Sequence, residues 1–472
     1  MACEWHSAPL GELISYIGKG VAPKYINDGP DATMVLGQKC VRNQALQYEQ
    51  ARFHNSAEKA VNPDKEVRKG DILVNATGVG SAGRVAQVMA DPSRQCITDG
   101  HVITLRAKDI NPFYLGYFVK SKQNTIELMA EGSTGQTEMN RQRLQNEIIV
   151  TFPESKDLQK RIAEYGLAID KKIAVNNQLN DYLLDLLKSS AKNLYLKHEK
   201  NIQEKLPSGW RWVSIGEIAD MVCRGIAPKY SLESDEIILG QTCIRNNLVL
   251  TENGRSHAPK KLTDKWLRKY DLLINSTGVG SLGRTAQVWF EPSKLVVDSH
   301  VTIVRATDKK NALYLGSWAF EHERYIESLH TGSTGQTELP RDRVKAIRVV
   351  LPDAGTLDEF NAIAEPSVKM IVANQEENKR LIEIRDTLLP KLMSGAIDVS
   401  KVDLTQLTNN HLLVRGHNVP NRYWKEHLWK PSLIMFCHRC RTCSIRRSSN
   451  IWPKYSESRY CQLRKHQRRR IC

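Results

Sequence analysis

The chain has 472 residues, with 68 Lys and Arg against 52 Asp and Glu, and a formal net charge of +16. A composition of 41% hydrophobic and 25% charged residues is typical of a globular protein. It excludes a chain that is disordered, collagen-like or a coiled coil throughout. This length supports about two to four domains.

The excess of positive charge lies at the C-terminal end. Residues 411–472 contain 15 Lys and Arg but only 2 Asp and Glu, so residues 1–410 carry a net charge of only +3. The high overall charge therefore does not by itself indicate that the body of the chain binds nucleic acid.

Several features predict a cytoplasmic protein. The longest apolar stretches fall far short of the ~20 residues that a membrane helix needs, so we expect no membrane association. The N-terminal MACEWHSAPLGEL lacks the basic patch and apolar core of a secretory signal. Ten cysteines scattered along the chain fit reduced thiols better than a disulfide framework.

The most informative feature is an internal repeat with a period of roughly 200 residues. The matching segments are KGDILVNATGVGSAGRVAQV at 69–88 with KYDLLINSTGVGSLGRTAQV at 269–288, DGHVITLRA at 99–107 with DSHVTIVRA at 298–306, and GSTGQTE at both 132–138 and 332–338. Their constant order indicates two copies of one domain. Within a copy, DILVN, RVAQV and HVITLR are enriched in β-branched residues and predict strands, whereas residues 111–130 predict a helix.

Each copy ends in a segment with the apolar spacing of a long helix, at 158–194 and at 357–393. The expected buried positions are Leu158, Ile162, Tyr165, Ile169, Leu179, Leu183 and Leu186 in the first helix, and Ile363, Met370 or Ile371, Leu381, Ile384 or Arg385, Leu388 and Leu392 in the second. We expect the two helices to pack along these seams, with the polar Asn176 fixing their register. The alternative is that each helix packs only on its own domain.

The sequence thus predicts an α+β protein in which two duplicated domains are separated by two long helices. The expected divisions are a first domain at 1–153, a helix at 154–200, a second domain at 201–352, a second helix at 353–398, and a basic tail at 399–472 that is either disordered or an aberrant C-terminus.

A glycine pattern in each copy resembles a dinucleotide fingerprint. It reads Gly78-x-Gly80-x-x-Gly83, and it recurs in the second copy from Gly278 to Gly283. A dinucleotide site requires that these glycines open a helix. The residues that follow are β-branched and soon reach a proline, so we predict a turn between two strands instead.

Other catalytic or metal-binding patterns are weak. The equivalent pairs Asp99 with His101 and Asp298 with His300 could act as acid and base, but without a nucleophile a structural hydrogen bond is the better interpretation. The cysteines from Cys437 to Cys443 lack the two separated pairs of a zinc knuckle, so we expect no metal site.

Polar residues recur at equivalent loop positions in both copies. Arg, Asn and Gln are the side chains that read guanine and adenine edges, while Lys, Thr and Tyr suit phosphate oxygens. The candidate DNA contacts are Lys24, Tyr25, Gln38, Arg42, Asn43, Asn75, Thr77 and Arg84 in the first copy, and Lys229, Tyr230, Gln241, Arg245, Asn246, Asn275, Thr277 and Arg284 in the second. The alternative for each residue is that it merely maintains a shared fold.

From about residue 5 to residue 408, the sequence resembles the specificity subunit of type I restriction-modification enzymes. The resemblance rests on the duplication and on LPSGWRWVSIGEI with its counterpart EWHSAPLGELI. It also rests on INSTGVGSLGR followed by DSHVTIVR, and on GSTGQTELPRDRVKAIRVVLP leading into a helix that ends LLPKLMSG. The tail departs from the family, whose members usually end soon after the second helix.

The resemblance implies two target-recognition domains, each reading one half of a split target in double-stranded DNA. The long helices would form an antiparallel, coiled-coil-like spacer, giving the chain pseudo-two-fold symmetry. Such a chain is not itself an enzyme and binds no cofactor. It docks two methyltransferase subunits, which use S-adenosylmethionine, and two restriction and translocase subunits, which use ATP and Mg²⁺.

The similarity of the two copies further predicts similar, nearly palindromic half-sites, as dimeric repressors have. Two alternatives from other classes stay open. One is a nucleotide-dependent enzyme built on the glycine turn, and the other is a duplicated interaction scaffold that does not bind DNA.

Overall fold

The computed structural model describes residues 4–131, 138–199, 205–231, 233–258, 264–332 and 337–399. The predicted tail beyond Val399, with its cysteines, lies outside the described residues, as does most of each GSTGQTE segment. No helix in the described part of the chain is both long enough and apolar enough to cross a membrane.

The first half of the chain builds a four-stranded sheet with the order β2-β11-β8-β9, in which neighbouring strands are antiparallel. A second sheet has the order β10-β4-β7-β3. The elements are β1 Trp5–Pro9, β2 Ile14–Lys19, β3 Tyr25–Ile26, β4 Ala32–Leu36, β5 Val41–Arg42, β6 Ala45–Leu46, β7 Arg52–Asn55, β8 Ile72–Asn75, β9 Val85–Gln87, β10 Cys96–Thr98, β11 Val102–Ala107, α1 Pro112–Ser121, α2 Gln123–Leu128, β12 Ala130–Glu131, β13 Glu138–Met139, α3 Arg141–Glu147 and β14 Ile149–Pro153.

The second half repeats this order. Its antiparallel sheet is β16-β24-β21-β22, and its second sheet is β20-β17-β23. The elements are β15 Arg211–Ser214, β16 Ala219–Arg224, β17 Ile237–Leu239, β18 Ile244–Arg245, β19 Leu248–Val249, β20 Arg255–Ser256, β21 Leu272–Asn275, β22 Thr285–Gln287, β23 Leu295–Val297, β24 Val301–Ala306, α5 Lys309–Glu321, α6 Glu323–Ser328, α7 Arg341–Ala346 and β25 Arg348–Leu351. The mixed helix and strand content that the sequence predicts is confirmed.

Two long helices complete the fold, α4 at Lys156–Glu199 and α8 at Ala354–Met393. The start of α8 is set by Asp353, whose Oδ1 accepts hydrogen bonds from the backbone N–H groups of Gly355 at 2.9 Å and Thr356 at 3.2 Å. Pro366 therefore lies inside the helix and does not begin it.

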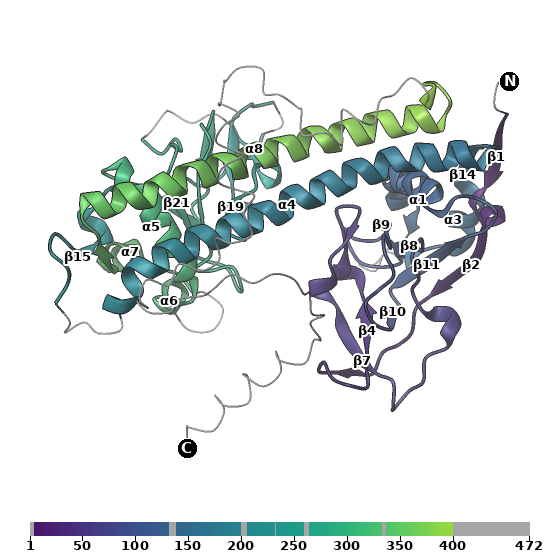
Figure 1. Ribbon diagram of the computed structural model, residues 1–472, viewed down its shortest axis with the longest axis horizontal. Helices are drawn as coiled ribbons and strands as arrows, with labels where there is room; N and C mark the ends of the chain where they lie inside the picture. Colours follow the sequence, from purple (N-terminus) through teal and green to yellow (C-terminus); the bar gives the residue numbers. More distant parts are fainter. Residues whose placement is uncertain are drawn as a thin grey trace, which may run out of the picture. The chain divides into compact units, whose positions relative to one another are not determined.

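The two long helices run antiparallel and side by side (Figure 1). Asn180 bonds Asn374, Asn176 bonds Asn378, and Asp170 bonds Arg385, so residue numbers fall along α4 as they rise along α8. Each helix also enters both cores. The N-terminal part of α4 and the C-terminal part of α8 pack in the first core, and their opposite ends pack in the second. Neither helix therefore packs only on its own domain.

The contact between the helices is polar near its middle. Asn176, Asn180 and Asn378 are buried there, and hydrogen bonds between their side-chain amides join α4 to α8. In the direction of the first core, the Asp170 carboxylate accepts from Tyr117 Oη at 2.6 Å, Arg385 Nη1 at 2.9 Å and Lys120 Nζ at 3.3 Å.

The predicted seam is correct at one end of α4 and wrong at the other. Ile162, Tyr165 and Ile169 are buried as expected, but Leu179 and Leu186 are exposed. Beyond Asn176 the buried positions are instead Asn180, Leu184, Leu187, Ala191 and Tyr195. The apolar spacing of the sequence could not predict this change of the buried face. A prediction from apolar spacing assigns only apolar residues to the interior, whereas asparagines of α4 are buried in the structure.

The seam of α8 needs a similar correction. Ile371 is buried, whereas Ile363 and Ile384 are exposed. Of the two residues left open at the next position, Arg385 is the buried one, because it has an ion-pair partner in Asp170.

Candidate nucleic-acid interface

The glycine pattern forms a tight turn between antiparallel strands in both halves. Ile72 of β8 pairs with Gln87 of β9, and Leu272 of β21 pairs with Gln287 of β22. In the first turn Gly78, Gly80 and Gly83 have φ values of 106°, 68° and 84°, in the left-handed region that suits glycine. The predicted strand turn is confirmed. No helix follows whose N-terminus could receive a pyrophosphate, so the geometry opposes a dinucleotide site.

In each turn, the side chain of an arginine donates a hydrogen bond to the backbone of the same turn. Nη2 of Arg84 donates to the backbone oxygen of Gly80 at 2.6 Å, and Arg284 makes the same bond to Gly280 at 2.6 Å. Both arginines remain partly exposed. Each can therefore hold the turn and present its remaining N–H groups to a ligand.

A series of hydrogen bonds connects the turn to neighbouring loops. In the first half, Gln38 Nε2 donates to the backbone oxygen of Thr77 at 2.8 Å, and Thr77 Oγ1 lies 2.9 Å from His101 Nδ1. The backbone N–H of His101 donates to Asp99 Oδ1 at 2.9 Å. Gln241, Thr277, His300 and Asp298 repeat this series in the second half.

The aspartate and histidine do not form an acid–base dyad. Each aspartate accepts from the backbone of its histidine, and the ring nitrogen Nδ1 faces a threonine hydroxyl. Burial raises the pKa of Asp99 and of Asp298, and the hydrogen bond from the histidine backbone opposes that rise. This arrangement fits the structural interpretation.

Two pairs of predicted contact residues have structural roles. Asn75 and Asn275 are fully buried, and their Nδ2 atoms donate to the backbone oxygens of Gln38 at 3.2 Å and Gln241 at 3.1 Å. Because both asparagines are fully buried, neither side chain is available for the DNA contact that the sequence predicts. The side-chain N–H groups of Gln38 and Gln241 are already engaged by the threonines of the turns.

The remaining candidates lie at the surface. Arg42 and Arg245 are exposed and immediately precede two-residue hairpin turns. Asn43 and Gln44 have φ values of 52° and 58°, and Asn246 and Asn247 have values of 52° and 59°. Such turns favour asparagine, so the turn explains its presence in both halves. The other candidates at the surface are Lys24, Tyr25, Lys229 and Tyr230, which are exposed, and Thr77 and Thr277, which are partly exposed.

Sequence reasoning missed two arginines beside these tyrosines. The guanidinium of Arg52 lies 3.7 Å from the ring centre of Tyr25 and donates to its hydroxyl, and Arg255 lies 5.1 Å from the ring centre of Tyr230. All four side chains are exposed. The recurrence of Arg-x-His in ARFH and GRSH is the signal that could have identified these arginines.

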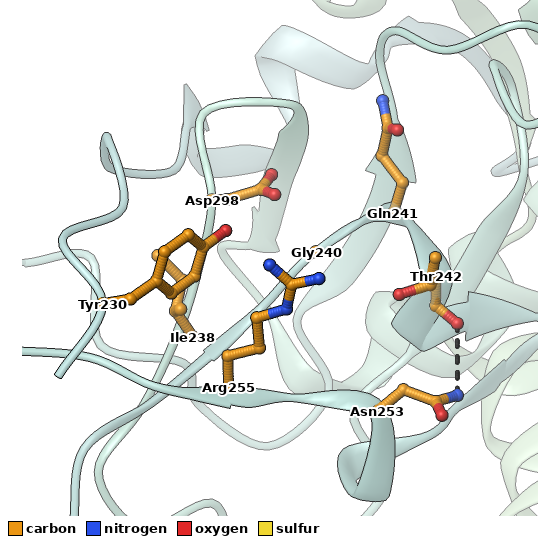
Figure 2. Close-up of a pocket in the computed structure, with 8 residues that line it drawn as sticks. All are labelled: Tyr230, Ile238, Gly240, Gln241, Thr242, Asn253, Arg255 and Asp298. Carbon is orange, nitrogen blue, oxygen red and sulfur yellow. Dashed lines mark hydrogen bonds between the residues drawn. The ribbon is translucent and has the colours of Figure 1, made fainter. Parts of the chain in front are cut away.

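In the second half this pair borders a pocket. Figure 2 shows the Arg255 guanidinium between Tyr230 and Thr242, with Gly240 next to it and Asp298 on the same side as Tyr230. Gln241 and Asn253 also line it. The pocket is therefore polar and combines hydrogen-bond donors with acceptors.

The structure thus has two similar polar surfaces, one in each half, and an antiparallel pair of helices joins the two halves. Residues 4–184 match the family model described as the type I restriction modification DNA specificity domain. The specificity subunit of the type I restriction enzyme MjaIX from Methanocaldococcus jannaschii is 22% identical over 312 residues, covering 61% of this chain and 70% of that protein. The HindI specificity subunit from Haemophilus influenzae is 21% identical over 196 residues, covering 41% of this chain and 42% of that protein.

Two solved structures are similar over 83% of this chain. One is the S subunit of a type I restriction-modification system from M. genitalium, 96% covered, with 18% identity and a TM-score of 0.47. The other is the HsdS subunit from Thermoanaerobacter tengcongensis, 97% covered, with 15% identity and a TM-score of 0.31. The family match and the curated relatives confirm the resemblance found in the sequence. This chain is similar to the specificity subunits of type I restriction enzymes, and residues 4–184 match the model of a DNA specificity domain.

Proposed function

We propose that this chain is the DNA specificity subunit of a type I restriction-modification complex, and that each half reads one half of a divided target. The observation that carries the proposal is the recurrence of the same partly exposed arginine on the same rigid turn in both halves, at Arg84 and Arg284. Arginine is the side chain most often used for specific contacts to bases.

The paired helices would set the gap between the half-sites. A helix of the length of α8 spans about 60 Å at 1.5 Å per residue. Because both helices enter both cores, the distance between the two halves is fixed by helix length and register. Two similar readers related by antiparallel helices suit similar half-sites on opposite strands.

The chemistry would reside in partner subunits. We propose two methyltransferase subunits that bind S-adenosylmethionine, and two restriction and translocase subunits that use ATP and Mg²⁺. An exposed apolar stripe on α4, formed by Val175, Leu179, Tyr182 and Leu186, is a suitable surface for a methyltransferase subunit. These four residues recur at the spacing of one helix face.

The test is to co-express the chain with the methyltransferase subunit of its own type I system and to map methylated adenines by sequencing. We expect a bipartite motif that disappears when this chain is omitted. The double change Arg84→Ala with Arg284→Ala should abolish site-specific methylation while the methyltransferase still co-purifies. An interaction scaffold without a DNA role predicts methylation that is unaffected by either manipulation.

A further inference from the structure

The cation–π pairs Arg52 with Tyr25 and Arg255 with Tyr230 occupy the same register in both halves. Tyr25 pairs with His54 across antiparallel strands, and Tyr230 pairs with His257 in the same way. Each arginine lies two residues before that histidine and therefore lies diagonally opposite the tyrosine, within reach of its ring. The pairing follows from the sheet, so both halves present the same group in the same place.

The cation–π contact also restricts the guanidinium. A guanidinium held over an aromatic ring keeps N–H groups with which it can donate to a ligand. The tyrosines are 44% and 54% exposed, and both arginines are exposed, so the N–H groups that the Tyr25 hydroxyl does not engage are accessible from solvent. The two rings would limit the rotation of side chains that otherwise have several free bonds, leaving less entropy to lose on binding.

The surroundings favour an uncharged partner over a phosphate. Asp298 lines the same pocket as Arg255, and Asp99 holds the equivalent place in the first half, within electrostatic range of Arg52. A carboxyl group beside the guanidinium opposes the approach of an anion. A base edge carries no net charge and can accept hydrogen bonds from the arginine.

We propose that Arg52 and Arg255 each read a guanine, one in each half-site, by donating to its O6 and N7 atoms in the major groove. This inference rests on the proposed function and names the base that the sites recognise. Because the two arginines are equivalent, the half-sites share a guanine at equivalent positions on opposite strands.

The first experiment uses the full chain co-expressed with its methyltransferase subunits. The wild-type motif should contain the shared guanine. Arg52→Ala should relax that position in one half-site and Arg255→Ala in the other, reducing discrimination by about 5- to 150-fold. The matched controls Arg68→Ala and Arg268→Ala change equivalent exposed arginines of the two halves and should leave the motif unchanged.

Two further variants separate base reading from a general electrostatic role. Arg52→Lys and Arg255→Lys keep the charge but lose the two-pronged geometry. Base reading predicts that they relax the motif by less than the alanine variants do, because lysine can still donate to guanine but without the fixed fork of arginine. A motif that stays intact in all four variants, or methylation that falls equally at every site, would overturn the inference.

The second experiment tests the atoms directly. Synthetic duplexes carry the wild-type motif with 7-deazaguanine, which lacks the N7 acceptor, at the shared position of one half-site. Methylation by the wild-type complex should slow by about fivefold or more, because one hydrogen bond of the pair is lost. The arginine variant for that half-site should show no further loss, and equal slowing in both proteins would contradict the assignment.

The outcomes distinguish this inference from the proposed function. If the wild-type chain directs no bipartite methylation, both fail. If it directs a bipartite motif without a shared guanine, only the inference fails. Thermal unfolding of each variant shows whether its effect comes from misfolding.

Discussion

The side chain of Asn176 in α4 donates to Oδ1 of Asn378 in α8 at 2.9 Å, and both residues are buried between the helices. Asn176 also donates to Glu377 Oε2 at 2.7 Å, and Asn378 donates to Asn177 Oδ1 at 2.8 Å. Sliding the helices by one turn would separate these partners and leave buried amides unpaired. The polar contact therefore specifies one register, and with it one distance between the two halves.

Replacing one asparagine of this contact should lower the free energy of unfolding more than replacing both asparagines. We expect Asn378→Leu to destabilise the chain by about 1–3 kcal/mol, because it leaves polar groups of α4 without their partner. Asn176→Leu with Asn378→Leu should recover part of that loss by packing apolar side chains together. Urea unfolding of the three proteins measures this, and a double variant less stable than the single one would contradict the assignment.

The ion cluster at Asp170 predicts a dependence of stability on pH. Burial raises the pKa of Asp170, but Lys120 and Arg385 more than offset this, and the pKa in the folded chain lies below its ordinary value. The unfolded chain therefore takes up the proton first, and the contribution of Asp170 to stability is lost as pH falls below about 4.

Asp170→Asn should remove this contribution at neutral pH. The change leaves the buried Lys120 and Arg385 without their shared anion, and we expect a loss of about 3 kcal/mol. The exposed Asp185 on the same helix is the control, and Asp185→Asn should change stability by no more than about 0.5 kcal/mol. Unfolding midpoints measured from pH 3 to pH 7 check this, and an Asp170→Asn variant that kept the wild-type profile would contradict it.

Alanine substitution should reduce stability by different amounts at two glycines of the same turn, Gly80 and Gly83. At Gly83 an added Cβ would lie 2.6 Å from Glu127 Cα, and φ is 84°, whereas at Gly80 φ is 68° and nothing lies within 4 Å. We expect Gly80→Ala to cost about 1 kcal/mol through backbone strain alone. Gly83→Ala adds a clash with the backbone and should cost about 2 kcal/mol more. Equal unfolding midpoints for the two variants would refute this reading of the turn.

The apolar stripe on α4 should be needed for assembly and not for folding. Leu179 and Leu186 are 37% and 43% exposed, so changing both to glutamine should alter the free energy of unfolding by no more than about 0.5 kcal/mol. We expect the double variant to lose at least one methyltransferase subunit on co-purification. Ile363→Gln, at an exposed position of α8, is the control and should retain both. Full assembly of the double variant would exclude the stripe as the docking surface.

The residue pattern alone was sufficient for part of the regular elements. The strands β8, β9 and β11 and the helices α1, α4 and α8 follow from apolar periodicity, turn residues and the repetition of one pattern in both halves. The glycine turn was also predictable, because strand formation after Gly83 depends on the local sequence.

The site was only partly predictable, because exposure depends on the whole fold. Asn75 and Arg84 both have polar side chains, so the sequence offers both as surface residues. In the structure Asn75 is buried against a loop, whereas Arg84 is partly exposed. Arg52 approaches Tyr25 only because two strands pair in a register that brings them together. Local sequence does not encode such cross-strand neighbours.

The duplication, the α+β elements, the long helices and the resemblance to type I specificity subunits could all be predicted from local sequence patterns. Which side chains are buried between the helices, which arginine contacts which tyrosine, and which candidates reach the surface depend on how distant segments pack together. The physical reason is that periodicity reports the average polarity of a face, whereas burial of Asn176 or Arg385 depends on a specific partner that lies about 200 residues away in the sequence.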